Sequence, residues 1–332
     1  MGDEASGSGE KTGVVLAALS ANAVIAVAKF VAASVTGSSA MLSEGIHSLA
    51  DTSNQALLLL GAHRSKRAPD AAHPFGYGQE LYFWGLIVAL VLFGLGGGLS
   101  IYEGIHQLMS HSSELGDPMW NYIVLGVAFL AEGISWTIAV RAFQRTRPEG
   151  RGLLRALNAS KDPRVFVPVG EDTAALAGIL VAFLGVLLSH QLQAPWIDSA
   201  ASIVIGLILA AVAFYLARET KNLLIGEGAD PRLADRIRAA AEGCDPIRHI
   251  GAVLTMQLGP DEVLLNLEVA VDPTLTVEQT ARALQDLEAA IREEAPEVTR
   301  IFSSLDIDRG TVSGGYARRG RRRSLGSGLR RA

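Results

Sequence analysis

The sequence predicts a membrane-embedded all-α bundle of six helices followed by a small cytoplasmic α+β domain. Hydrophobic residues make up 49% of the 332 residues, which is high for a soluble protein. Six segments are long and apolar enough to cross a bilayer as helices. From about residue 226 the apolar runs give way to patterns typical of a water-soluble domain. We therefore expect four parts: a polar N-terminal tail (1–12), a transmembrane domain (13–225), a cytoplasmic domain (226–309) and a disordered basic tail (310–332).

The six expected spans cover about 13–36, 40–62, 80–105, 119–143, 171–190 and 196–217. Lys and Arg gather in the connections 63–79 and 141–170, whereas the three alternate connections contain none. The positive-inside rule then places both termini in the cytoplasm and predicts a multi-pass protein of the plasma membrane. The N-terminal residues MGDEASGSGEKTG do not resemble a signal peptide, so we expect the first span to be retained.

The cytoplasmic part is expected to have the element order αββαβ. Residues 231–243 predict an amphipathic helix with Pro231 near its start, and 249–258 predict a strand. Residues 263–271 alternate, which predicts a strand with one buried face made of Val263, Leu265, Leu267, Val269 and Val271. A second helix over 276–293, capped by Thr274 or Thr276, and a strand over 298–307 complete the domain. This order suggests helices on one face of a sheet.

The second span carries a polar stripe, which is unusual for a membrane helix. Each helical residue turns the chain by about 100°, so the polar residues of this span share one face: Glu44, His47, Asp51, Asn54 and Gln55. We expect this face to line the bundle interior. His47 and Asp51 are spaced i, i+4, and an imidazole with a carboxylate at this spacing is half of a divalent-metal site, best suited to zinc. The alternative is a His–Asp hydrogen bond that only holds helices together.

A second acidic cluster is expected to supply the remaining ligands. Glu171 and Asp172 stand at the start of the fifth predicted span. One of them can point towards the second span while the other faces a neighbouring helix or water. The alternative is that both are interfacial acids favoured by the dipole of the helix N-terminus.

Other residues exclude some sites and leave other roles open. The single cysteine, Cys244, excludes an intramolecular disulfide and any Cys-cluster metal site. No GxxxxGK[ST] phosphate-binding loop occurs, which excludes ATP bound in this way as the energy source. Lys29 in the first span is expected either to reach the interface or to pair with an acid.

Four sequence stretches resemble the cation diffusion facilitator family, whose members exchange zinc or related divalent cations for protons. HSLAD (47–51) matches the metal-binding HxxxD of the family's second span, and HPFGYGQE (73–80) resembles its following loop. LLIGEGAD (223–230) resembles the exit from the sixth span, and KDPRVFVPVGEDTAAL (161–176) resembles the branch that includes zinc transporter nine and its bacterial relatives. The resemblance implies a ferredoxin-like cytoplasmic domain and a homodimer.

The sequence departs from the family pattern at three places. With Asp172 aligned on the family's aspartate of the fifth span, the histidine position falls on Pro168, so either Glu171 substitutes or three protein ligands act with water. The loop site of some relatives maps to Asp70, His73 and Tyr77, with Tyr where a His is usual. In the cytoplasmic domain Asn266 replaces a ligand histidine and the one remaining histidine is His249, so we expect no binuclear zinc site there.

These observations together predict a proton-coupled antiporter that exports a divalent cation from the cytoplasm. The expected metal ligands are His47, Asp51 and Asp172, with Glu171 as a further candidate. Zn²⁺ is the expected ion, and Co²⁺, Fe²⁺, Mn²⁺ and Ni²⁺ suit the same donors less well. We expect no resident cofactor and no nucleic-acid partner, with the basic tail near anionic lipid. The rival hypotheses are a membrane-embedded metalloenzyme, which would want an HExxH-type base beside the metal, and a structural membrane scaffold.

Overall fold

The computed structural model describes residues 22–110, 117–146, 156–157, 159–245 and 247–306. The chain forms two compact units. The first holds the described residues up to Ala229 together with Met256–Val263, and the second holds Asp230–Thr255 together with the described residues from Leu264 on. The tails expected over 1–12 and 310–332 lie outside the described residues, as does the first part of the first expected span.

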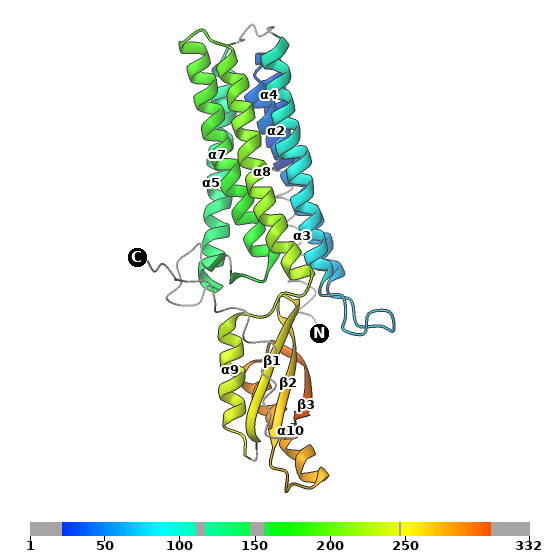
Figure 1. The fold of residues 1–332 in the computed structure, drawn as a ribbon. Helices are drawn as coiled ribbons and strands as arrows, with labels where there is room; N and C mark the ends of the chain where they lie inside the picture. Colours follow the sequence, from blue (N-terminus) through cyan, green and yellow to red (C-terminus); the bar gives the residue numbers. More distant parts are fainter. Residues whose placement is uncertain (1–21, 111–116, 147–155, 158, 246, 307–332) are drawn as a thin grey trace, which may run out of the picture. The chain divides into compact units, whose positions relative to one another are not determined.

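The first unit consists of long helices that run side by side (Figure 1). In chain order, its described helical segments are Asn22–Thr36, α2 (Ser39–Arg64), the continuous run of α3 (Glu80–Val91), η1 (Leu92–Gly98) and α4 (Leu99–Ser110), α5 (Met119–Thr146), α7 (Pro163–Gln191) and α8 (Trp196–Leu224). By length and composition, four described helices can cross a membrane: Glu80–Ser110, Met119–Gln144, Pro163–Gln191 and Trp196–Leu224. The described part of the first span is shorter. Helix α2 has 26 residues, and its polar stripe lowers its hydropathy.

Helix α8 is the central packing element of this unit. It packs against α2, α3, η1, α4 and α7. Helix α5 packs against α7. The buried face of α8 carries Ile205, Leu209, Ala213 and Leu216. Side chains on the far side of α5, such as Leu130 and Ile134, are more than 60% exposed, as expected for residues that contact lipid. The predicted membrane bundle followed by an α+β domain is confirmed.

Glycines bring α8 into backbone contact with η1 and α4. A Cβ atom added at Gly97 would lie 3.1 Å from the carbonyl oxygen of Gly206, and one added at Gly206 would lie 2.8 Å from that of Gly97. A Cβ at Gly104 would lie 2.7 Å from the carbonyl oxygen of Ser199. Small residues at such positions let membrane helices approach closely. We call the line of contact at Gly97, Gly104 and Gly206 the glycine seam, because the backbones of the two facing segments touch along it. The π-helical segment η1, sequence LFGLGGG, lies at one end of the seam.

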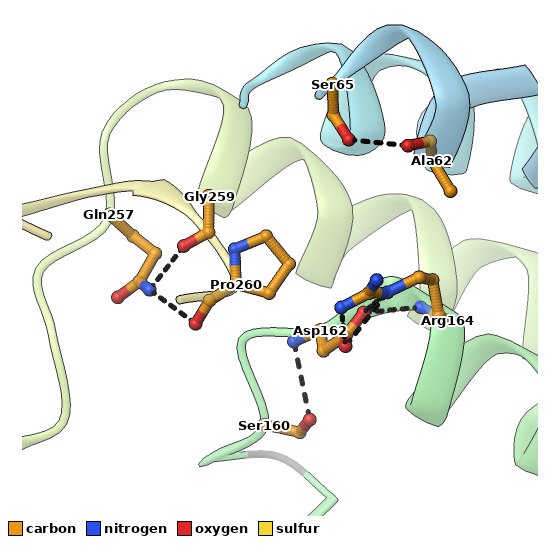
Figure 2. A network of polar contacts seen from close by, with 8 residues as sticks. All are labelled: Ala62, Ser65, Ser160, Asp162, Arg164, Gln257, Gly259 and Pro260. Atoms are coloured by element: carbon orange, nitrogen blue, oxygen red, sulfur yellow. Dashed lines mark hydrogen bonds and ion pairs between the residues drawn. The ribbon is translucent and has the colours of Figure 1, made fainter. Parts of the chain in front are cut away.

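Helix α7 begins eight residues before the position that the sequence predicted. Asp162 caps it by accepting from the backbone N–H of Arg164 (2.9 Å), and Pro163 occupies the first turn (Figure 2). Arg164 also binds the Asp162 carboxylate through its guanidinium, and the N–H of Asp162 donates to Ser160 Oγ (3.4 Å). Pro168 is accommodated inside the helix. The expectation that the fifth helix starts at residue 171 is therefore wrong.

Figure 2 also shows local hydrogen bonds at two other places in the first unit, the end of α2 and the end of β1. Ser65 Oγ donates to the carbonyl of Ala62 (3.1 Å) where α2 ends. At the end of β1, Gln257 Nε2 donates to the carbonyl oxygens of Gly259 (2.6 Å) and Pro260 (3.2 Å).

The predicted order αββαβ is confirmed: α9 (Pro231–Glu242), β1 (Ile247–Gly259), β2 (Glu262–Val271), α10 (Val277–Glu294) and β3 (Val298–Asp306). The three described strands form one sheet in the order β1-β2-β3. The expected alternation on β2 is also observed: Val263, Leu265, Leu267 and Val269 are buried, whereas Val271 is only partly buried. Of the two threonines proposed as a cap, Thr276 caps α10 in a capping box with Gln279.

Candidate metal centre

The polar stripe of α2 faces the interior of the bundle. Glu44, His47 and Asn54 are fully buried, and Asp51 is 8% exposed. Gln55, the fifth residue of the predicted stripe, is only partly buried. The stripe is thus shielded from lipid, as membrane helices with ionisable residues require.

His47 and Asp51 lie in contact on this stripe. Nε2 of His47 is 3.3 Å from Oδ2 of Asp51, the geometry expected for an i, i+4 pair. Neither imidazole nitrogen makes a hydrogen bond, and Oδ1 of Asp51 and Oδ1 of Asn54 are also buried without a hydrogen-bond partner. Buried polar atoms normally have partners, so these unpartnered atoms need an explanation. A cation that arrives between them would supply one.

Glu171 and Asp172 lie in the third turn of α7 and face different helices. Glu171 is buried and accepts a hydrogen bond from Asn54 Nδ2 of α2 (2.7 Å). Asp172 accepts from Ser135 Oγ of α5 (2.9 Å). The start of α7 at Pro163 explains why the two acids lie inside the bundle and not at a helix N-terminus. Glu171 is therefore the acid that reaches the α2 stripe directly.

The structure brings the four predicted ligands together only in part. His47 contacts Asp51, and Glu171 reaches the stripe through Asn54. In the described part of the chain, no group of three or more His, Cys, Asp or Glu residues is close enough to hold a metal ion. A complete centre would need the α7 carboxylates to move towards the His47–Asp51 pair.

A buried lysine also belongs to this neighbourhood. Lys29 Nζ donates to Glu44 Oε2 (3.0 Å) and to Ser48 Oγ (2.8 Å). Glu44 and Ser48 lie on either side of His47 in the sequence of α2. Pairing with an acid was one of the two roles that the sequence allowed for Lys29. The sequence did not single out Glu44, because that pairing depends on how two helices pack.

A further buried acid, Asp198 near the start of α8, holds the N-terminus of α2. It accepts hydrogen bonds from Ser38 Oγ (2.8 Å), from the backbone N–H groups of Ser39 (2.7 Å) and Ala40 (3.3 Å), and from Ser39 Oγ (3.3 Å). Sequence reasoning missed this residue. Its only signal was an acid in the first turn of the sixth span, which would ordinarily be assigned to the N-terminus of its own helix.

The loop residues aligned with the second metal site of some relatives bind one another. Asp70 Oδ2 accepts from the Tyr77 hydroxyl (2.7 Å), and Oδ1 accepts from the backbone N–H groups of Ala72 and His73. The Tyr77 hydroxyl is the main reason why the pKa of the Asp70 carboxyl is lowered from its usual range. The Tyr77 ring packs against that of His73 and under the Arg67 guanidinium. Tyr77 thus occupies the carboxylate that a metal would need.

Comparison with known proteins matches both units to models of one protein family. A family model described as the cation efflux transmembrane domain matches residues 15–225, and one described as the cation efflux protein cytoplasmic domain matches residues 229–303. Both matches agree with the resemblance seen in the sequence motifs.

Individual relatives extend over most of the chain. The human "Proton-coupled zinc antiporter SLC30A9, mitochondrial" is 32% identical, over 87% of this chain and 51% of the human protein. "Metal tolerance protein C4" of Arabidopsis thaliana is 30% identical, over 80% of this chain and 58% of its own length. "Manganese efflux system protein MneP" of Bacillus subtilis is 24% identical, over 87% of this chain and 93% of its own length. The chain thus spans little more than half the length of the first two relatives.

Proposed function

Because the chain belongs to the cation efflux family, we propose that it is a secondary transporter that exports a divalent transition-metal cation in exchange for protons. Zn²⁺ is the proposed cargo. The human relative is named as a proton-coupled zinc antiporter, and the Bacillus relative as a manganese efflux protein. A nitrogen ligand beside carboxylates suits Zn²⁺ better than the harder Mn²⁺.

The observation that carries this proposal is the buried His47–Asp51 pair with its free lone pairs. We propose that a metal ion binds there with Asp172 and Glu171 from α7, or with three of these side chains and water. The contact between Asn54 and Glu171 supports the approach of α7, since it already links the two helices.

Proton coupling follows from the chemistry of these ligands. An imidazole and carboxylates hold a metal ion only when deprotonated, so metal binding releases protons and protonation releases metal. A site that opens alternately to the two sides of the membrane, and that holds either metal or protons, performs antiport.

Topology and assembly complete the proposal. The distribution of Lys and Arg favours cytoplasmic termini, and we propose the plasma membrane as the location, although the human relative is named as mitochondrial. We also propose that the chain works as a homodimer, which the match of residues 229–303 to the family's cytoplasmic domain supports.

The test is Zn²⁺-driven proton flux in proteoliposomes that contain the purified full-length chain. Asp51→Asn preserves size but removes the charge that opposes the metal, so flux should fall to background while the protein still elutes as a single species. Asp172→Asn should behave in the same way, and Glu171→Gln should cause a smaller loss if water can replace that ligand. Ser53→Ala, at an exposed position of the same helix, is the matched control and should transport normally.

Normal flux in both Asp51→Asn and Asp172→Asn would overturn the site. A wild-type chain that binds Zn²⁺ but moves neither Zn²⁺ nor protons would instead favour a metalloenzyme. Absence of any Zn²⁺ binding would favour a scaffold.

A further inference from the structure

A full positive charge lies buried beside the proposed metal ligands. Both Lys29 and Glu44 have side chains that are 0% exposed, and the Lys29 ammonium contacts Glu44 and Ser48. An ammonium group has three donors and no acceptor, so it cannot bind a metal ion itself. What it can do is neutralise an acid and repel another cation.

Stability alone is a weak explanation for this pair. Removing two charges from water is costly, and well-packed apolar residues of similar size often stabilise a protein at least as well as a buried ion pair. The surroundings are nevertheless shaped around it. A Cβ atom at Gly178 of α7 would lie 2.4 Å from Glu44 Oε1, so glycine at this position lets the carboxylate lie where it does. Glu44 Oε1 is also buried without a hydrogen-bond partner.

We propose that Lys29 is an internal counter-cation that sets the metal affinity of the site; this rests on the proposed function. Lys29 keeps Glu44 out of the ligand set. Its charge also opposes a divalent ion near His47 and Asp51, because charges interact strongly where little water screens them. The site then holds a metal ion weakly enough to release it in each cycle. Lys29 and Glu44 are thus affinity-setting residues that do not touch the cargo.

The two members of the pair should act in opposite directions. Lys29→Met removes the repelling charge and frees the Glu44 carboxylate, so Zn²⁺ should bind about tenfold more tightly. Glu44→Gln leaves the ammonium uncompensated, so Zn²⁺ should bind about tenfold more weakly. The double variant Lys29→Met/Glu44→Gln should return close to the wild-type affinity, and Lys29→Arg should keep it.

The measurement is Zn²⁺ competition with a fluorescent chelator, on the full-length chain in lipid nanodiscs. Flux should complement it: Lys29→Met should lower both KM and kcat, since metal release becomes slow. Lys161→Met is the matched control, because Lys161 also pairs with an acid, Glu227 (2.8 Å), at a partly exposed position. Its Zn²⁺ affinity should equal that of the wild type.

Shifts of opposite sign that cancel in the double variant would support the proposal. Shifts of the same sign, or no shift in either variant, would overturn it and leave the pair as a packing element. If Lys29→Met does not fold, Glu44→Gln decides alone, and an unchanged or tighter affinity overturns the proposal. Wild type and Asp51→Asn are measured alongside: equal Zn²⁺ binding by these two would refute the proposed site itself, independently of Lys29.

Discussion

Asp51 and Asp198 are both buried carboxylates of the membrane unit, yet they differ in how many hydrogen bonds they accept. Asp198 accepts four hydrogen bonds from the start of α2, two of them from backbone N–H groups. Asp51 contacts His47, and its Oδ1 has no hydrogen-bond partner. A carboxylate with hydrogen bonds to both of its oxygens, as in Asp198, holds the fold together. One with an unpartnered oxygen, as in Asp51, is the kind of carboxylate that the proposed metal site requires.

The difference comes from where each acid meets α2. Asp198 reaches the N-terminus of that helix, where unpaired N–H groups and the dipole favour a negative charge. Asp51 lies in the middle of the same helix, where the backbone N–H groups are already bonded and only side chains can pair with it. Two acids therefore bind α2 differently: Asp198 of α8 pairs with the end of the helix, whereas Asp51, the proposed metal ligand, lies in its interior.

Stability measurements can break this comparison, and they carry the largest expected effect. Asp198→Asn puts an NH₂ group against donors and should lower the free energy of unfolding by about 2 kcal/mol or more. Asp51→Asn removes a poorly paired buried charge, so its free energy of unfolding should stay within about 1 kcal/mol of the wild type or rise. Thermal unfolding of the detergent-purified chain without metal would show a lower Tm for Asp198→Asn only. Equal losses in the two variants would refute the distinction.

Selectivity sharpens the functional side of the comparison. His47→Asp keeps the i, i+4 spacing to Asp51 but replaces a borderline nitrogen donor by a hard oxygen. We expect the ratio of Mn²⁺ to Zn²⁺ transport to rise several-fold, about 1 kcal/mol in relative preference. Competition flux between the two ions in proteoliposomes measures the ratio. A ratio equal to that of Ser53→Ala would mean that His47 does not touch the cargo.

Asp272, between β2 and α10, adds a third case, a well-paired acid in water, with the smallest expected effect. Hydrogen bonds from the Thr274 hydroxyl and N–H, with the Arg248 guanidinium, lower the pKa of Asp272 to about 2. A folded-state pKa below the unfolded value means that the stabilisation exists above about pH 4 and is lost as the pH falls towards 2.

Asp272→Asn should therefore weaken the second unit slightly at pH 7, and the gap to the wild type should close between about pH 4 and pH 2. Hydrogen exchange of α10 amides in the full-length chain reports this. A gap that is constant over this range would show that the carboxylate charge is not responsible.

The sequence predicted those features that follow from periodicity within one element. The polar stripe on α2, the contact of His47 with Asp51 and the alternation on β2 all depend on residue spacing along a single helix or strand. The order of elements in the second unit was predicted for the same reason.

The features that sequence reasoning missed depend on contacts between helices or on a misread start signal. Glu44 meets Lys29 and Asp198 meets Ser39 only because separate helices pack together, and no local pattern encodes these pairs. The start of α7 was misplaced because the prediction followed the long apolar run and did not use the signals that precede it. The Asp162–Pro163 pair, an N-cap followed by proline in the first turn, was the better signal.

The glycine seam between α8 and the η1–α4 segment has a consequence for how this protein can be mapped by mutagenesis. Alanine is ordinarily the mildest replacement, since it only deletes atoms. At Gly97, Gly104 and Gly206 it adds one, and that atom would lie within 3.1 Å of backbone on the facing helix. An alanine scan would therefore report three severe losses of activity at positions that touch no ion. Those losses would report the separation of two tightly packed helices by the added methyl group. They would not identify residues that take part in a step of the transport cycle.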